Sequence, residues 1–244
     1  MTDWTKKYFD DFYLKYFLLN QNEEITEKQV RFVEKFIPKG GKILDAGCGI
    51  GRHSIKLGEL GFTVKGIDSS PLYIEYAKKD AERRNLKNVS FCLEDLRNLK
   101  YKNEFDGVIN LWSSFGYFDD ETNFKILLKF AEALKKHGRL IIDIENRDYI
   151  LKYFVRETFR EKGELFILER RRFHPLTSVV TTHRYIIGKS VRKEYLRNIR
   201  IYSATEMINL FKAAGIEVLG VFGDYDGTKF GENSKRIIII GQKS

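Results

Sequence analysis

The feature that most limits the possible folds is a regular alternation of short apolar runs and amphipathic segments between residues 42 and 144. Short apolar runs bounded by turn residues indicate buried strands, and apolar residues spaced three or four apart indicate helices. This alternation predicts a doubly wound α/β fold, a mostly parallel sheet with helices on both faces and right-handed crossovers. The expected strands are 42–46, 62–67, 89–93, 105–111 and 139–144, and the expected helices are 52–60, 71–84 and 121–136.

The residues before this region predict two helices. Aromatic side chains at helical spacing predict a helix over 3–19 whose aromatic stripe packs against the core. Thr26 and Gln29 fit the pattern of a capping box, so a second helix is expected to begin at Thr26 and to end before Pro38.

The pattern changes after residue 150, where the chain becomes rich in β-branched and aromatic residues. Three such runs, at 165–173, 179–187 and 191–202, are separated by short turns and predict an antiparallel meander. A second capping box, Ser203 with Glu206, opens a helix to Ala214. Two closing strands are expected at 217–222 and 236–240.

The meander carries most of the net positive charge. The whole chain has a formal net charge of +9, and residues 151–200 contain 13 basic and 5 acidic residues, which gives +8. A basic surface of this kind attracts an acidic substrate or nucleic acid, but it is also typical of a solvated hairpin. Because residues alternate across a strand, Arg170 and Arg172 should share one face and Arg171 the other. This division predicts that most of the charge is solvated and that one or two arginines turn toward a pocket.

Composition excludes several other classes. No apolar run approaches the roughly 20 residues that span a bilayer, and the first residues lack the layout of a signal peptide, so a cytoplasmic protein is expected. Cys48 and Cys92 form no disulfide framework, and the four histidines have no metal-ligand spacing, so no metal site is expected. Abundant Lys, Arg, Glu and Ile with scarce Gln is a balance also seen in heat-adapted proteins.

A glycine-rich loop, Asp45-Ala46-Gly47-Cys48-Gly49-Ile50-Gly51, ends the first strand and opens the next helix. Glycines let backbone amides approach a ligand closely, and the helix N-terminus behind them favours an anionic group such as a carboxylate. A dinucleotide fingerprint would need glycine at position 52, which is arginine, and the Gly-Lys-Ser/Thr of a phosphate-binding loop is missing. The loop therefore disfavours a nicotinamide oxidoreductase.

The run from Asp45 to Gly51 resembles the first motif of the class I S-adenosylmethionine-dependent methyltransferases. The resemblance continues through acids at the ends of the second and third strands, the run 105–110, and the Gly138-Arg139-Leu140 turn. It implies a seven-stranded sheet in the order 3-2-1-4-5-7-6 with an antiparallel last strand. Within the superfamily, Gly51-Arg52-His53 and Ser113-Ser114-Phe115-Gly116-Tyr117 look like the small-molecule branch that inserts a meander before its last helix.

This resemblance also divides the chain and implies a cofactor. The expected units are an N-terminal helical lid over 1–37, a cofactor-binding Rossmann-like core over 38–150, the inserted meander over 151–202, and the completion of the core over 203–244. The implied cofactor is S-adenosylmethionine, with S-adenosylhomocysteine as product. The residues that the resemblance assigns to the cofactor are Asp45, Gly47, Cys48, Gly49, Arg52, Asp68, Ser69, Asp95, Leu96 and Asn110.

Some of these assignments leave alternatives open. Asp68 lies where an acid would receive the ribose hydroxyls, whereas Asp45 could instead cap the helix that follows it. Either Glu94 or Asp95 could bind adenine. Arg52 could contact the cofactor carboxylate or be solvated.

The catalytic residues are less legible, because methyl transfer needs mainly proximity, alignment and exclusion of water. Ligands in open α/β sheets bind outside the carboxyl ends of the strands, which nominates residues 110–117, 145–147 and the loop 223–231. Tyr117 is the first candidate for orienting the acceptor, followed by Arg147 and Glu145.

The leading hypothesis is a methyltransferase that acts on a small molecule, with O, N or C as the accepting atom. The basic meander is compatible with an acidic substrate. The alternative is an RNA or protein methyltransferase that docks its substrate on the basic meander. The Asn/Asp-Pro-Pro-Tyr/Phe motif of enzymes that methylate exocyclic base amines is missing, since Asn110 is followed by Leu111-Trp112-Ser113. A third hypothesis is a cofactor-binding regulator without catalysis. A monomer and a homodimer are both compatible with the sequence.

Overall fold

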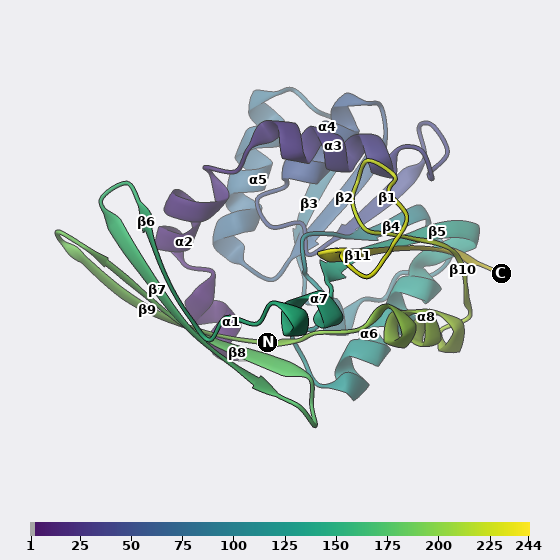
Figure 1. Cartoon of the computed structure of the whole chain (residues 1–244). Helices are drawn as coiled ribbons and strands as arrows, with labels where there is room; N and C mark the ends of the chain where they lie inside the picture. The colour runs from purple at the N-terminus through teal and green to yellow at the C-terminus, as the bar shows by residue number, and fades with distance from the viewer. Residues whose placement is uncertain (1–2) are drawn as a thin grey trace.

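The computed structural model describes residues 3–244. A seven-stranded sheet forms the centre, helices cover both of its faces, and a separate four-stranded antiparallel sheet lies to one side, at the lower left of Figure 1. The first helical segments, within residues 3–18, lie between the two sheets in that view.

The central sheet has the predicted strand order. Along the sheet the strands run β3, β2, β1, β4, β5, β11 and β10, and β11 is antiparallel to both β5 and β10. The remaining neighbours pair in parallel. The bounds are β1 (Lys42–Ala46), β2 (Thr63–Asp68), β3 (Val89–Leu93), β4 (Phe105–Asn110), β5 (Leu134–Glu145), β10 (Ile216–Phe222) and β11 (Arg236–Lys243). The order 3-2-1-4-5-7-6 is therefore confirmed.

Two apolar cores hold the helices to this sheet. One core joins α3 (Glu23–Val33), α4 (Arg52–Glu59) and α5 (Pro71–Arg83) to one face. The other joins α6 (Asp120–Ala133) and α8 (Ala204–Ala213) to the opposite face, beside the short η2 (Leu96–Asn98). Sheets buried on both faces need near-continuous apolar strands, and Ile237, Ile238, Ile239 and Ile240 of β11 are all 0% exposed.

Several predicted boundaries are wrong for local reasons. Helix α3 begins at Glu23, because Asn22 accepts a hydrogen bond from the amide of Glu24 and caps the helix. Thr26 is therefore inside the helix and does not open a capping box. The expected helix over 3–19 is divided into α1 (Asp3–Tyr8), α2 (Asp11–Tyr13) and the π-helical η1 (Leu14–Leu18). The division falls at Asp10, whose carboxylate caps α2 by accepting from the amide of Tyr13.

The meander contains four strands, not three. The order is β6 (Glu157–Lys162), β7 (Leu165–His174), β8 (Val179–Gly188) and β9 (Val191–Arg200), all antiparallel and separate from the central sheet. Its inner face packs against the N-terminal segment in a third apolar core. A buried ion pair, Glu169 with Arg184, lies on this inner face. Although burial opposes its charge, Arg184 and Arg171 lower the pKa of Glu169 to about 2.

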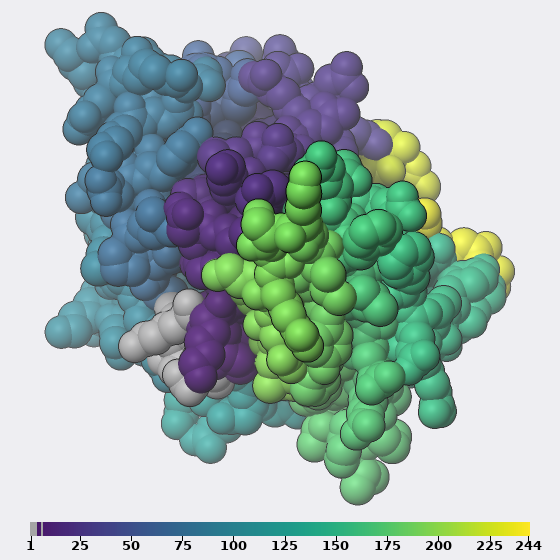
Figure 2. Space-filling model, turned by 90° about the vertical axis from the view of Figure 1, so that its left-hand side faces the viewer, coloured from purple at the N-terminus to yellow at the C-terminus, as the bar shows by residue number. Residues whose placement is uncertain are grey.

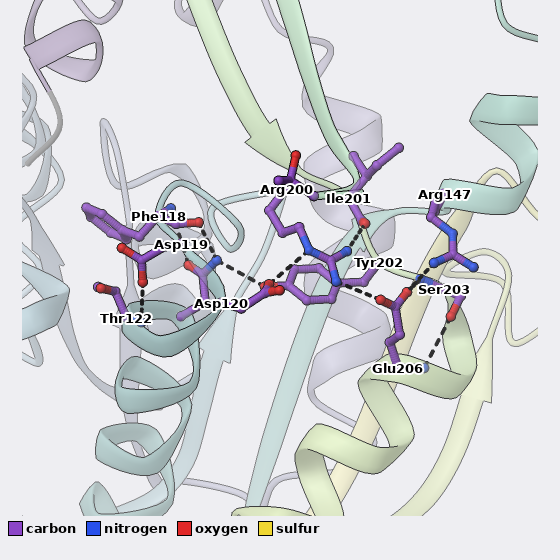
Figure 3. A network of polar contacts seen from close by, with 12 residues as sticks. Phe118, Asp119, Asp120, Thr122, Arg147, Arg200, Ile201, Tyr202, Ser203 and Glu206 are labelled. Atoms are coloured by element: carbon purple, nitrogen blue, oxygen red, sulfur yellow. Dashed lines mark hydrogen bonds and ion pairs between the residues drawn. The ribbon is translucent and has the colours of Figure 1, made fainter. Parts of the chain in front are cut away.

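A polar joint fixes the meander to the core (Figure 3). Arg200, at the end of β9, donates to Asp120 of α6 and to Glu206 of α8, at 2.9 Å and 2.6 Å. Arg147 of α7 (Arg147–Lys152) donates to the second oxygen of Glu206 at 2.6 Å. The predicted capping box of Ser203 with Glu206 is confirmed, so one glutamate caps α8 and receives both arginines.

Arg200→Ala is expected to lower the free energy of unfolding by about 1–2 kcal/mol, because Asp120 and Glu206 lose their charged donor. A urea titration followed by circular dichroism measures this change. The matched control is Arg170→Ala, since Arg170 also pairs with a glutamate but its side chain is 61% exposed. The control should change the free energy of unfolding by less than about 0.5 kcal/mol. An equal decrease in both variants would contradict the prediction that the joint stabilises the protein more than an exposed ion pair does.

Candidate active site

A cavity of about 290 Å³ lies at the carboxyl ends of the parallel strands, where an open α/β sheet binds its ligands. Its floor is formed by the glycine loop and by residues that follow β2, β3 and β4. Its roof is formed by the N-terminal segment and by β9. Of the residues nominated from the sequence, those that line the cavity are Gly47, Cys48, Gly49, Arg52, Asp68, Ser69, Asp95, Leu96, Tyr117 and Glu145.

The glycine loop has backbone conformations that other residues rarely adopt. Gly47 and Gly51 have φ angles of 80° and 79°, and a Cβ on Gly51 would lie 2.6 Å from the ring of Phe91. The amides of Gly47 and Cys48 both donate to the carbonyl of Ile67, at 2.8 Å and 2.9 Å. The loop is thus pinned to β2 and lies open toward the cavity.

Asp68 is oriented at the end of β2 by two backbone amides. Gly49 donates to one carboxylate oxygen at 3.0 Å, and Ser70 donates to the other at 2.9 Å. Burial raises the pKa of Asp68 above its ordinary value. A carboxylate held in this way can accept hydrogen bonds from ligand hydroxyls without moving.

Asp45 and Asn110 lie beneath the loop and do not line the cavity. Asp45 is 1% exposed and accepts a hydrogen bond from Ser54 Oγ at 2.6 Å. Asn110 is fully buried and donates to the carbonyl of Ala46 at 2.6 Å. Their geometry supports the loop from below, and burial raises the pKa of Asp45 to about 6.

The first turn of α4 places one unsatisfied donor, on Arg52, at the loop end of the cavity. Arg52 Nη1 donates to Thr26 Oγ1 and Gln29 Oε1, both at 2.7 Å. His53 Nε2 also lies 2.8 Å from Gln29 Oε1, and burial holds the pKa of His53 well below its ordinary value. Within residues 3–244, Arg52 Nη2 and Gln29 Nε2 are buried without a hydrogen-bond partner. An anionic ligand group beside Arg52 would satisfy such donors.

The loop after β4 is held in a strained conformation. Trp112 and Ser113 have φ angles of 59° and 61°, which are uncommon for residues other than glycine. Asp143 of β5 accepts from the amide of Trp112 at 3.0 Å, and its backbone carbonyl accepts from the amide of Ser113 at 2.9 Å. Arg236 of β11 pairs with Asp143 and donates to Ser113 Oγ at 2.9 Å. Arg52 and Arg236 lie 5.0 Å and 5.3 Å from the ring of Trp112.

The other end of the cavity combines aromatic rings with an ion pair. Arg197 of β9 lies 3.8 Å from Glu145, between a guanidinium nitrogen and a carboxylate oxygen. Its Nε is buried and has no partner among the described residues. Burial raises the pKa of Tyr117 above its ordinary value, so the phenol keeps its proton and can act as a donor.

Two nominated regions lie elsewhere. Arg147 does not line the cavity and belongs to the joint, where it pairs with Glu206 and Asp148. The loop 223–231 also does not line the cavity. Tyr225 is 5% exposed, packs in an apolar core, and donates its hydroxyl to Asp143 at 2.6 Å.

The geometry does not decide whether Glu94 or Asp95 would bind adenine, because both acids follow β3 and line the cavity. Glu94 accepts a hydrogen bond from the hydroxyl of Tyr101 at 2.6 Å. Asp95 caps η2 by accepting from the amide of Arg97 at 2.9 Å.

Sequence reasoning expected a helical lid over 1–37 but did not name its cavity-lining residues, and it missed the charged pair of Asp143 and Arg236. The aromatic stripe was predicted to pack, and it does, but Tyr8, Phe9 and Tyr13 also line the cavity. Asp143 lies between Ile142 and Ile144 of β5, and a charge between isoleucines is a signal that could have marked it as functional. Arg236 is the first residue of β11 and follows Lys235, so it gave no such signal.

Comparison with known proteins agrees with this geometry. A family model described as a methyltransferase domain matches residues 37–197. YqeM of Bacillus subtilis (strain 168), whose name assigns it only to the methyltransferases, is 25% identical over 225 residues, which cover 89% of this chain and 90% of that protein. The glycine/sarcosine N-methyltransferase of Aphanothece halophytica is 35% identical over 139 residues, which cover 55% of this chain and 52% of that protein.

Among solved structures, the CcbJ methyltransferase from Streptomyces caelestis has the same fold, with a TM-score of 0.87 at 16% identity and coverage of 98% of this chain and 99% of that one. The fold and the cavity define a class I S-adenosylmethionine-dependent methyltransferase. The chain belongs to the family of that methyltransferase domain. A solved structure from Clostridium acetobutylicum ATCC 824 that is named as an S-adenosylmethionine-dependent methyltransferase has the same fold, with a TM-score of 0.82 at 18% identity. None of the helices in the described part of the chain is long and apolar enough to cross a membrane.

Burial of Asp45 predicts a measurable pH dependence of stability. Its folded pKa of about 6 lies above the unfolded value of about 3.9, so its favourable contribution is complete below that unfolded value and is lost as pH rises through 6. Asp45→Asn keeps the acceptor for Ser54 and has no proton to lose. Between pH 4 and 7 the unfolding free energy of this variant should rise relative to the unmodified protein by on the order of 1–3 kcal/mol.

Asp119→Asn is the control for this experiment. The amide of Thr122 lowers the pKa of Asp119 at the N-terminus of α6, so its pH dependence has the opposite sign. Denaturant titrations at several pH values measure both differences. A constant difference between Asp45→Asn and the unmodified protein would contradict the assignment.

Proposed function

We propose that the cavity holds S-adenosylmethionine at its loop end and a small acidic methyl acceptor beneath the roof. Asp68 would receive the ribose hydroxyls, since its carboxylate is already fixed by two amides. Asp95 and Leu96 would contact the adenine. The unpartnered Nη2 of Arg52, which lines the cavity, would bind the cofactor carboxylate, and the amides of the glycine loop would contact the same end.

The roof over the cavity is the observation that favours a small acceptor. Residues of α1, α2 and η1 cover the cavity, and Asp10 ties them to β9 through Lys193 Nζ at 3.0 Å and the Tyr195 hydroxyl at 2.9 Å. A polymer would have to displace this roof to reach the cavity, whereas a small molecule fits beneath it. The N-terminal segment is therefore a lid in this proposal.

Arg197 supports an acidic acceptor. Although burial opposes its charge, Glu145 and the neighbouring tyrosines hold the pKa of Arg197 above its ordinary value, so the guanidinium stays charged. Its unpartnered Nε can donate to a carboxylate or phosphate. Glycine and sarcosine, which the relative from Aphanothece halophytica is named for methylating, carry such a carboxylate.

The protein's own groups then have separate roles in the transfer. The cofactor supplies an electrophilic methyl group on a sulfonium. Tyr117 donates a hydrogen bond that orients the acceptor, and Arg197 holds its acidic group. Glu145 lies beside Arg197 and takes up a proton when the accepting atom must lose one. The remaining contribution is exclusion of water beneath the aromatic roof.

The basic meander gives little support to RNA docking. Arg171 turns inward to Glu169, while Arg170 faces outward and pairs with Glu157, as the alternation predicted. The cations therefore do not gather on one face with aromatic rings among them, as a nucleic-acid platform requires.

Asp68→Ala is expected to weaken S-adenosylmethionine binding by about 1–3 kcal/mol, because ligand hydroxyls lose their acceptor. Isothermal titration calorimetry measures this loss, with Asp68→Asn as a second variant that preserves the shape of the side chain. The control is Asp226→Ala, in the loop outside the cavity, which should bind the cofactor normally. Unchanged binding in both Asp68 variants, or tight binding of a nicotinamide dinucleotide, would contradict the cofactor site.

Arg197→Gln should raise the KM for an acidic acceptor by roughly 10-fold or more, since it removes a charge-assisted hydrogen bond, and should leave cofactor binding unchanged. Methyl-labelled cofactor, incubated with a panel of small acids and their amides, measures transfer, with total RNA assayed in parallel. Arg172→Gln, on an exposed position of β7, is the control. Labelled RNA, or acids and amides methylated equally well, would contradict the proposal.

A further inference from the structure

The outer face of the four-stranded sheet carries an apolar patch that the site does not use. Five large apolar side chains on it are exposed, and the rings of Phe159 and Phe166 stack at 5.8 Å. Scattered exposed apolar residues are ordinary, but a contiguous group on one face indicates a contact surface. The members of the patch and their exposed fractions are Phe159 (61%), Phe166 (44%), Leu168 (38%), Ile187 (44%) and Leu196 (39%).

Strand register makes these residues neighbours. Phe159 lies opposite Leu168, and Phe166 lies opposite Ile187. Leu196 is in the next row, opposite His183. Directly opposite side chains in antiparallel strands are about 5 Å apart, so the patch is continuous across β6, β7 and β8 and reaches β9. Figure 2 shows the meander, in green, at the surface of the molecule beside the purple N-terminal helices.

The charges around this patch are balanced, although the meander as a whole is basic. The surplus cations point inward or into the joint: Arg171 and Arg184 pair with Glu169, and Arg200 pairs with Asp120 and Glu206. The outer positions that remain hold three acids and three bases, which are Glu157, Glu161, Glu194, Arg170, Arg172 and Arg192. A balanced face has no net attraction for a polyanion or an anionic membrane. It suits a partner with the same mixture of charges.

The order of residues across one row is self-complementary. From one edge of the sheet to the other the row reads Glu161, Phe166, Ile187 and Arg192. A twofold axis along the strands, between β7 and β8, would place Glu161 opposite the partner's Arg192. The same axis would place Phe166 opposite the partner's Ile187. Apolar residues then meet at the centre and opposite charges meet at both edges.

We propose that this outer face is the contact surface of a homodimer, in which a second copy of the chain packs its own β6–β9 sheet face to face. Strands about 4.8 Å apart and about 3.4 Å per residue make a face of roughly 600 Å², close to the roughly 800 Å² that each partner buries in a standard interface. The isologous arrangement of a twofold dimer is the commonest form of assembly. The active sites lie on the inner side of each sheet and remain accessible.

Sedimentation velocity over a range of micromolar concentrations tests this proposal on the full chain. The expected species has a mass of about 57 kDa, twice the 28.7 kDa of one chain. Phe166→Glu should shift the protein to a monomer. Leu176→Glu is the matched control, because Leu176 is 91% exposed in the β7–β8 turn and outside the patch, so this variant should remain dimeric.

Charge reversal tests whether the partner on this face is a second copy of the chain. Glu161→Arg alone and Arg192→Glu alone should each weaken the dimer by roughly 10-fold or more, and the double variant should restore it. Within one chain these residues lie on opposite edges of the sheet, so rescue requires contact between two copies. Cofactor binding by every variant, measured by calorimetry, confirms that the core is folded. A monomer at all concentrations, a dimer that survives Phe166→Glu, or a double variant that shows no rescue would overturn the proposal.

Discussion

One wall of the active site depends on a buried carboxylate, Asp143. It is fully buried in β5, and it receives the amide of Trp112, the hydroxyl of Tyr225 and the guanidinium of Arg236. A buried charge is tolerated only when its oxygens are satisfied, and here the donors come from three separate segments of the chain. The strained loop after β4 has its shape because these contacts outweigh its backbone preference. This wall of the cavity therefore depends on the pairing of β11 with β5, which places Arg236 beside Asp143.

The core could be predicted from the sequence because its signals are local. The bounds of β1 and β3 match the prediction to the residue, since each is a short apolar run between polar or turn residues. Strand β6 was missed because four of its six residues are charged, so it shows no apolar alternation. It forms by pairing with β7, and pairing between strands is invisible in a local pattern.

The cofactor side of the site could also be predicted from local sequence signals, because the glycine loop and Asp68 belong to one strand–helix–strand unit. The acceptor side joins Tyr117, Glu145 and Arg197, which come from distant parts of the chain. Arg197 was one of several arginines in a basic strand, and only the packing of β9 against the N-terminal segment distinguishes it from its solvated neighbours. Arg147 does not line the cavity, because its guanidinium pairs in the joint with Glu206, a residue far along the sequence.

The meander leaves and rejoins the core at one point. Asn146 and Tyr202 form a backbone bridge, and the amide of Arg147 donates to the carbonyl of Tyr202 at 3.0 Å. The residues between these two positions form an insertion whose ends meet at the central sheet. Lengthening such an insertion costs little chain entropy, about 0.6 kcal/mol for each doubling of its length. The insertion also supplies Arg197 to the cavity. Evolution could therefore exchange or rebuild this one segment to change what is methylated, while the fold and the cofactor chemistry are inherited intact.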